Sequence, residues 1–267
     1  MGVDPGKTRK ILVVHGVQTG KDEDLNQDKL IKELIKNRLG DLPLKFDVEL
    51  YKYENINDEA QAKFQFLLNL FVTNPVGRIL AKEALDLVGD VVISLQDGKV
   101  AAEIRQGLRE KIVGIYDSEA PCYIVAHSLG TIYTFDVLNE LMRDAAYFDR
   151  TSRRTWPVQG LITMGSPIGL DMFKIRGRKQ IADLGEGQKW LRWVNYFDVT
   201  DPVVSGNIFG QQLVGYKIAE KYLKKTTRQG WVIRDRSVDT GKVWLAAHTA
   251  YWENPIVGDG LVDMITN

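Results

Sequence analysis

Residues 123–130 read Tyr-Ile-Val-Ala-His-Ser-Leu-Gly, and they decide the fold of this 267-residue chain. The run from Tyr123 to Ala126 has the nearly continuous apolar pattern of a strand that is buried on both faces. Beyond Ser128 the pattern changes to that of a helix. There, apolar residues recur at a spacing of three at Ile132, Phe135, Leu138 and Leu141. Ser128 is therefore expected in a tight turn between a buried strand and a helix.

This turn has the residues that a reactive serine needs. A sharp turn from strand to helix strains the serine backbone and projects its hydroxyl above the sheet. Only small residues fit two positions before and two positions after it, where Ala126 and Gly130 stand. The amide of Leu129, at the start of the helix, is free to meet a developing oxyanion. The alternative is that Ser128 only caps the helix, but the strand before it and the helix after it favour a nucleophile.

The segment from Ala126 to Gly130 resembles the G-x-S-x-G nucleophile elbow of the α/β-hydrolase family, particularly its lipase and esterase branch. Ala126 replaces the usual first glycine and is still small. The resemblance implies a Ser-Asp-His triad in which the acid and then the histidine follow the serine along the chain.

Short β-branched runs alternate with helical patterns along the sequence. This alternation predicts an α/β fold with a mainly parallel sheet and helices on both of its faces. Strands are expected at Ile11–His15, Phe46–Tyr53, Tyr123–Ala126, Leu161–Met164 and Trp193–Phe197, with a weaker candidate at Trp231–Asp235. Helices are expected at Asp28–Asn37, at Val100–Tyr116 and after the elbow.

The resemblance assigns the base to one of three histidines. His15 precedes the elbow and His127 lies within it, so only His248 can follow an acid in the family's order. His248 and Tyr251 form an H-x-x-Y arrangement that is similar to the histidine loop of many lipases. We therefore expect His248 to take the proton of Ser128 while an acceptor holds its second ring nitrogen.

Two aspartates compete for the role of that acceptor. Asp198 and Asp201 both follow the expected strand Trp193–Phe197, where the family places its acid. Asp201 begins an Asp-Pro-Val segment that looks like the D-x-V segment of lipases, and the proline stiffens the loop. Asp198 lies closer to the strand end and could instead hold the turn through an Asx-type bond. We favour Asp201, with Asp239 as a remote alternative.

The oxyanion hole is expected to combine two amides. One belongs to Leu129, and the other to Val17, which follows the His15-Gly16 step at the end of the first strand. The turn Gly165-Ser166-Pro167 is expected at the rim of the pocket. Substrate contacts are expected from His15, Gly16, Phe64, Leu67, Phe71 and Pro167.

Residues 55–98 are surplus to a single crossover between strands. They are also too apolar for a solvated loop, so something must cover them. We predict that they form a helical cap inserted between the two parts of the hydrolase core, residues 1–54 and 99–267. Static packing against the core, as an extra helical layer, is the alternative.

Composition excludes several classes of protein. Lys plus Arg and Asp plus Glu balance at 35 each, so the chain has no global attraction to nucleic acid or to anionic membranes. The single cysteine, Cys122, excludes an internal disulfide and a cysteine-based metal site. A signal-peptide core and a membrane span are both missing from the sequence pattern, so a cytoplasmic protein is expected.

These observations predict a serine hydrolase that forms an acyl-enzyme and needs no cofactor or metal. Carboxylic esters, lipid-like ones included, are the leading substrates, because the insertion is apolar and the elbow resembles that of lipases. Thioesterase and acyltransferase chemistry use the same triad. The alternative from another class is a non-catalytic member of the fold that binds ligands or other proteins.

Overall fold

The computed structural model describes residues 6–16, 26–40, 42–53, 98–141, 144, 146–147, 158–169, 191–205, 207–208, 211–212, 218, 231–242 and 245–267. Six parallel strands form its central sheet, in the order β2-β1-β3-β4-β5-β8. Their bounds are β1 Arg9–Val14, β2 Phe46–Tyr51, β3 Cys122–His127, β4 Val158–Met164, β5 Leu191–Phe197 and β8 Trp231–Ser237.

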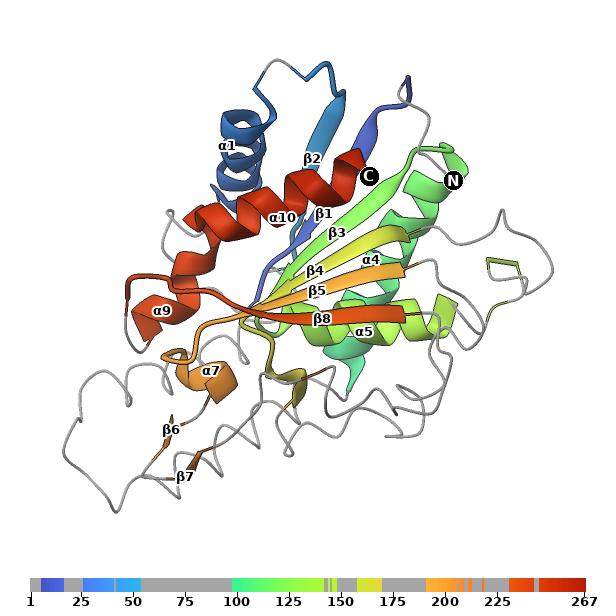
Figure 1. Ribbon diagram of the computed structural model, residues 1–267. Helices are drawn as coiled ribbons and strands as arrows, with labels where there is room; N and C mark the ends of the chain where they lie inside the picture. The colour runs from blue at the N-terminus through green and yellow to red at the C-terminus, as the bar shows by residue number, and fades with distance from the viewer. Residues whose placement is uncertain are drawn as a thin grey trace.

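Helices cover both faces of this sheet (Figure 1). The long helices are α1 Gln27–Leu39, α4 Lys99–Asp117, α5 Gly130–Leu141 and α10 Pro255–Thr266. Helices α1 and α10 pack on one face, and α4 and α5 pack on the other (Figure 1). Short elements complete the described chain: η3 Pro167–Gly169, α7 Pro202–Ser205, α9 Leu245–Thr249, η4 Ala250–Glu253 and the antiparallel pair β6 Asn207–Ile208 and β7 Gln211–Gln212.

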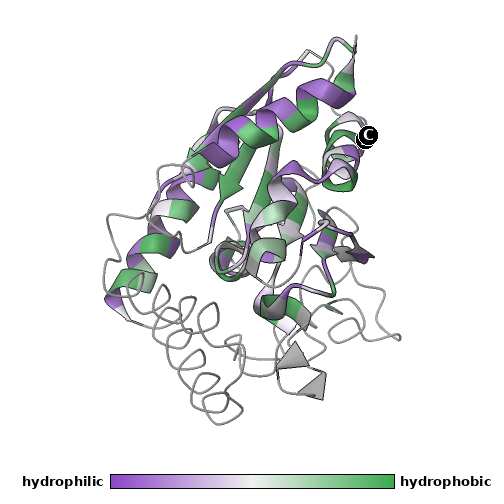
Figure 2. Ribbon diagram, turned by 90° about the vertical axis from the view of Figure 1, so that its left-hand side faces the viewer, coloured by the Kyte–Doolittle hydropathy of each residue, from purple (hydrophilic) through white to green (hydrophobic). Residues whose placement is uncertain are grey.

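The two helical layers explain why the inner strands read as continuous apolar runs. In β1, Ile11 and Val13 point to the core under α1 and α10, whereas Leu12 and Val14 point to the core under α4 and α5. Both faces of the strand are therefore buried, so alternation between apolar and polar residues disappears. Figure 2 shows the result: the central strands are green, whereas the surrounding helices alternate between green and purple.

This architecture is the α/β-hydrolase fold, with a parallel sheet, helices on both faces and a serine turn between β3 and α5. The expected strands and helices are all present, each shifted by a few residues at its ends. The predicted cap, residues 55–98, lies outside the described residues except for Gly98, which precedes α4. Among the helices that the structure describes, none combines the length and apolar character needed to cross a membrane.

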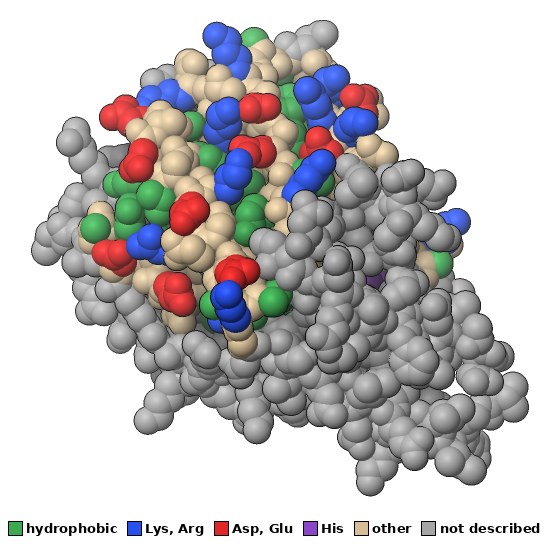
Figure 3. Space-filling view, turned by 180° about the vertical axis from the view of Figure 1, so that it is seen from behind, with side chains coloured by type: hydrophobic (Ala, Val, Ile, Leu, Met, Phe, Trp, Pro, Cys, Tyr) green, Lys and Arg blue, Asp and Glu red, His purple; other side chains and the backbone are tan. Residues whose placement is uncertain are grey.

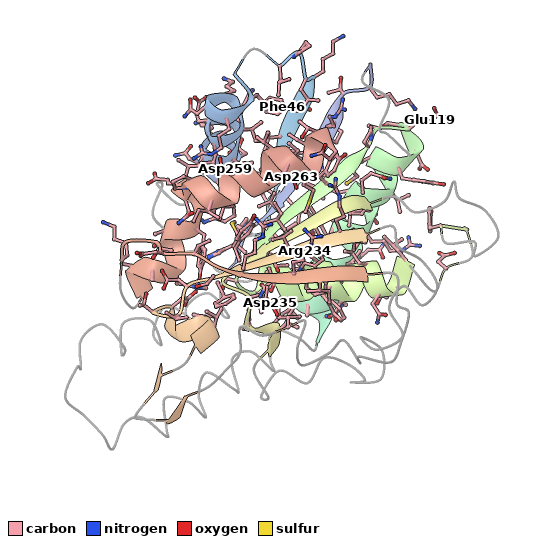
Figure 4. The ribbon with its side chains drawn as sticks, viewed as in Figure 1. Phe46, Glu119, Arg234, Asp235, Asp259 and Asp263 are labelled. Atoms are coloured by element: carbon pink, nitrogen blue, oxygen red, sulfur yellow. The ribbon has the colours of Figure 1, made fainter. Side chains whose placement is uncertain are left out.

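Strand β8 is the outermost strand on one side of the described sheet. This position explains why its sequence has only a weak apolar strand pattern. Arg234 and Asp235 lie along it (Figure 4). Charged residues on an edge strand discourage pairing with another chain, but they also interrupt the apolar run that identifies inner strands. On the face seen from behind, basic and acidic side chains are interspersed over the described surface (Figure 3).

Candidate active site

Ser128 has the strained backbone that the elbow requires. It follows β3 directly and has a φ angle of 52°, in the left-handed region that residues with a side chain rarely adopt. Its amide donates a hydrogen bond of 3.0 Å to the carbonyl of Met164 at the end of β4. The hydroxyl is thus held at the carboxyl edge of the sheet, between β3 and α5.

The small residues near Ser128 are required because two backbone segments, the loop after β1 and the turn between β3 and α5, approach each other closely. A Cβ atom built on Gly130 would overlap the carbonyl oxygen of His15. One built on Gly16 would lie 2.5 Å from the Cβ of Ser128. The loop after β1 therefore passes directly against the turn, and a larger side chain at either glycine would push the loop away from Ser128.

Three side chains from separate segments of the chain meet in one hydrogen-bonded line. The Ser128 Oγ atom lies 2.9 Å from Nε2 of His248, and Nδ1 of His248 lies 2.9 Å from Oδ2 of Asp201. His248 comes from α9, and Asp201 from the loop between β5 and α7. All three are buried, with 4%, 5% and 0% of their surface exposed for Ser128, His248 and Asp201. An imidazole placed this way can accept the serine proton at Nε2 while its Nδ1–H donates to the carboxylate.

Besides His248, Asp201 accepts hydrogen bonds from Val203 and Tyr251. Its Oδ1 accepts from the amide of Val203 at 2.9 Å, and its Oδ2 also accepts from the hydroxyl of Tyr251 at 2.8 Å. The Tyr251 hydroxyl in turn accepts from the amide of Asp198 at 2.8 Å. Burial and the negative charge of Asp201 raise the pKa of Tyr251, so its hydroxyl stays protonated and donates.

Asp198, the competing acid, holds a turn instead. Its carboxylate accepts hydrogen bonds from the amide and hydroxyl of Thr200, and from the amide and hydroxyl of Thr240. The bond from the Thr200 amide is the expected Asx-type contact. Burial opposes ionisation, but the bonds from Thr240 and Thr200 outweigh it and lower the pKa of Asp198 below its ordinary value. Between the two aspartates, it is Asp201 that contacts the imidazole of His248.

His127 and His15 are the other two histidines, and both are buried. Nε2 of His127 lies 2.6 Å from the carbonyl oxygen of His248, and the two rings are 4.6 Å apart. Burial, together with the charge of His248, lowers the pKa of His127 well below its ordinary value, so the neutral ring donates to that carbonyl. His15 stacks on Tyr53 at 4.5 Å, and its Nδ1 lies 2.5 Å from the carbonyl oxygen of Gly16.

The remaining expected site residues fall into two groups. Leu129 follows the nucleophile and precedes the first residue of α5, and Pro167 begins η3 two residues after Gly165, which contacts the site. Val17 and the apolar residues Phe64, Leu67 and Phe71 lie outside the described residues. Within the part of the chain that the structure describes, no cluster of His, Cys, Asp and Glu could hold a metal ion.

Sequence reasoning did not assign Tyr251 or Thr131 a role, although both touch the site. Tyr251 follows His248 by three residues, and Thr131 follows Ser128 by three, so one helical turn brings each pair together. That spacing is a usable signal. Thr240, which anchors Asp198, has no comparable signal because 42 residues separate the two.

The fold and the hydrogen-bonded line of serine, histidine and aspartate define the chain as an α/β-hydrolase-fold protein with a complete candidate triad. No protein-family model matches the sequence, and no curated protein matches it. Among solved structures it is similar to TT1662 from Thermus thermophilus, with 9% identity, a TM-score of 0.40, and coverage of 97% of this chain and 88% of that one. It is also similar to a mutant of the esterase Est22, with 10% identity, a TM-score of 0.39, and coverage of 98% and 71% respectively. Likenesses this distant say nothing about the chemistry of the site.

Proposed function

We propose that the protein is a serine hydrolase that cleaves carboxylic esters through an acyl-enzyme. One observation carries the proposal: the hydroxyl of Ser128, on a strained left-handed backbone, lies 2.9 Å from an imidazole that is itself 2.9 Å from a buried carboxylate. Strain of this kind costs about 1–3 kcal/mol and persists where function maintains it. A serine that only capped α5 would not need it.

The proposed reaction has two halves. In the first, the Ser128 oxygen attacks the ester carbonyl carbon while Nε2 of His248 takes the hydroxyl proton. The tetrahedral intermediate places its negative oxygen near the amides of Leu129 and Val17. It then collapses, and the alcohol leaves with the proton from His248. In the second half, water gives a proton to His248 as its oxygen attacks the acyl carbon. The second tetrahedral intermediate then collapses: the bond to the Ser128 oxygen breaks, that oxygen takes the proton back from His248, and the carboxylic acid leaves.

Asp201 supports both halves through its charge. It is fully buried, and its two oxygens accept from His248, Tyr251 and Val203. These hydrogen bonds replace the hydration that the buried carboxylate loses. Its charge fixes the imidazole tautomer with the proton on Nδ1 and stabilises the imidazolium that forms in each half-reaction.

The apolar segment 55–98 supports a lipid-like acyl group as the substrate. In this proposal the segment covers Ser128, and Phe64, Leu67 and Phe71 contact the acyl chain and keep bulk water away from the acyl-enzyme. Replacing Leu67 and Phe71 with serine should reduce kcat/KM for p-nitrophenyl palmitate much more than for p-nitrophenyl acetate, with little change in Tm. A large fall in Tm with equal losses on both esters would show that the segment is core.

A fluorophosphonate probe tests the function directly, because the probe labels activated serines. The wild-type protein should be labelled at Ser128 and should hydrolyse p-nitrophenyl esters. Ser128→Ala should abolish labelling and nearly all turnover without changing Tm. Ser118→Ala is the matched control, since Ser118 lies at the end of α4, where its hydroxyl donates to the carbonyl of Ile115. An unlabelled wild-type protein that is inactive on the whole ester series would favour the non-catalytic alternative.

A further inference from the structure

Both peptide groups beside Ser128 are fixed by hydrogen bonds. The peptide before it donates through the Ser128 amide to Met164 at 3.0 Å. The peptide after it accepts twice at the Ser128 carbonyl oxygen, from the amide of Thr131 at 3.0 Å and from the hydroxyl of Thr131 at 2.6 Å. The second peptide matters most, because it contains the amide of Leu129.

The direction of the Ser128 carbonyl determines the direction of the Leu129 amide. A trans peptide is planar, and its C=O and N–H bonds point in opposite directions. No cis peptide occurs among the described residues. The two bonds from Thr131 draw the Ser128 carbonyl into the first turn of α5. The Leu129 N–H therefore points the other way, out of the helix N-terminus, where an oxyanion on a Ser128 adduct would form.

A second serine holds the Thr131 hydroxyl in place. Oγ of Ser166 lies 2.8 Å from Oγ1 of Thr131. A threonine hydroxyl has one proton, and that of Thr131 is used on the Ser128 carbonyl, so Ser166 is the donor in this pair. Thr131 and Ser166 are 0% and 1% exposed, so water does not replace either bond. Ser166 follows Gly165, whose backbone lies against His248 and Asp201.

We infer that Thr131, held by Ser166, is a positioning residue that aims the Leu129 amide at the oxyanion. This inference rests on the proposed hydrolase function and deepens it. Without the Thr131 hydroxyl, the Ser128 carbonyl keeps only the weaker backbone bond, and the strained turn is free to rotate its second peptide. The effect falls on the transition state and on the tetrahedral intermediate, because the negative charge on the oxygen develops there and is not present in the bound ester.

Helix α5 contains a matched control for this bond. The hydroxyl of Thr134 donates to the carbonyl of Gly130 at 2.8 Å, and Thr134 is also fully buried. Thr131→Val and Thr134→Val therefore remove the same kind of bond from the same helix. Only the first bond belongs to the peptide that carries the Leu129 amide.

The experiment measures turnover of p-nitrophenyl butyrate and the affinity for an alkyl trifluoromethyl ketone, which forms a tetrahedral adduct with the serine. Thr131→Val should lower kcat at least tenfold, leave KM within about twofold, and weaken ketone binding by a similar factor, since removing an oxyanion donor outright costs about 10²–10³. Ser166→Ala should show the same pattern at a smaller size. Thr131→Ser, which keeps the hydroxyl, should restore most of both. Thr134→Val should also lower Tm, by less than Thr131→Val because Thr131 bonds Ser166 as well, but it should leave kcat and ketone binding unchanged.

Equal losses of kcat and ketone affinity in Thr131→Val and Thr134→Val would overturn the inference while the hydrolase function stands. So would normal kcat in both Thr131→Val and Ser166→Ala. If Thr131→Val does not fold, Thr131→Ser and Ser166→Ala decide the matter by the same two measurements. A wild-type protein that neither turns over the ester nor binds the ketone would overturn the proposed function, and this inference with it.

Discussion

At the scale of single residues, the two aspartates after β5 differ in what they hold. Asp201 accepts from His248, whereas Asp198 accepts from Thr200 and Thr240. In the proposed reaction, the first contact orients the ring that moves the proton. The second ties one loop to another.

This difference predicts unequal effects of removing each charge. Asp201→Asn should lower kcat by about 10³–10⁴, because an amide at this position favours the wrong imidazole tautomer. Asp198→Asn should cost much less kcat, and its main effect should be a lower Tm, since the amide cannot accept all four hydrogen bonds. Steady-state kinetics with p-nitrophenyl butyrate and thermal melts of both variants separate the two roles. Equal losses of kcat would place the acid at Asp198.

Tyr251 is the residue-scale feature that connects the two aspartates. Its hydroxyl donates to Asp201 and accepts from the amide of Asp198. Tyr251→Phe should lower kcat about tenfold, because Asp201 loses a hydrogen bond worth about 1.5–3 kcal/mol to a charged group. Tyr123→Phe is the control, since Tyr123 packs in the same core cluster and its buried hydroxyl has no partner among the described residues. Similar kcat values for the two variants would show that Tyr251 serves packing alone.

Some contacts of the candidate site could be predicted from a short stretch of sequence, whereas others could not. Ser128 and its elbow could be predicted because strand, turn and helix lie within one short stretch. The prediction of His248 and Asp201 also needed the order in which serine, acid and histidine follow one another in the family that the sequence resembles. The bond from Tyr251 to Asp201 could not be predicted, because it spans 50 residues and depends on where α9 and the loop after β5 meet.

At the scale of elements, helix α10 is absent from the helices expected from the sequence. Its residues include Pro255, Gly258 and Gly260, which are poor helix formers in isolation. Close packing explains why glycines stand at positions 258 and 260. A Cβ atom on Gly258 would lie 2.7 Å from Cγ of Leu34 in α1, and one on Gly260 would overlap the hydroxyl oxygen of Tyr196 in β5. Tertiary contact therefore overrides helix propensity here, and propensity alone predicts no helix.

A pair of glycine substitutions tests this explanation. Gly114 lies in α4, where an added Cβ atom would meet nothing within 4 Å, so Gly114→Ala should raise the free energy of unfolding by about 0.5–1 kcal/mol through helix propensity. Gly260→Ala makes the same chemical change in α10 but forces Tyr196 or the helix to move, and it should destabilise by about 1–3 kcal/mol. Urea unfolding curves of both variants measure the two effects. Stabilisation by Gly260→Ala would contradict the close packing of α10 on the sheet.

At the scale of the whole molecule, the common direction of the strands places the residues of the candidate site at one edge of the sheet. All six strands are parallel, so the turns after β1, β3, β4 and β5 reach the same edge. The alternation of strands with helices predicts this arrangement from sequence, because parallel neighbours need a crossover. The apolar runs of the inner strands strengthen the prediction. The edge strand β8 is less certain from sequence for the same physical reason, since an edge position accepts charges that an inner strand excludes.

The buried histidine beneath the site should make stability depend on pH. His127 is 6% exposed, and burial lowers its pKa well below the value of about 6.5 that it has in the unfolded chain. Below that pH the unfolded state binds a proton that the folded state does not, so the free energy of unfolding falls as the pH falls. Between pH 7.5 and pH 5.5 this one group should therefore lower the free energy of unfolding by about 1 kcal/mol.

His127→Gln should remove this part of the pH dependence, because glutamine does not titrate and its amide can still donate a hydrogen bond. Urea unfolding of the wild type and the variant at pH 7.5 and 5.5 measures the difference. The wild type should lose about 1 kcal/mol more than the variant between these values. Asp198 does not interfere in this window: its lowered pKa makes it stabilising above about 3.8, and that stabilisation is lost only as the pH falls further. Equal losses in the two proteins would mean that His127 is protonated in the folded state, and the bond to the His248 carbonyl would then be that of a charged ring.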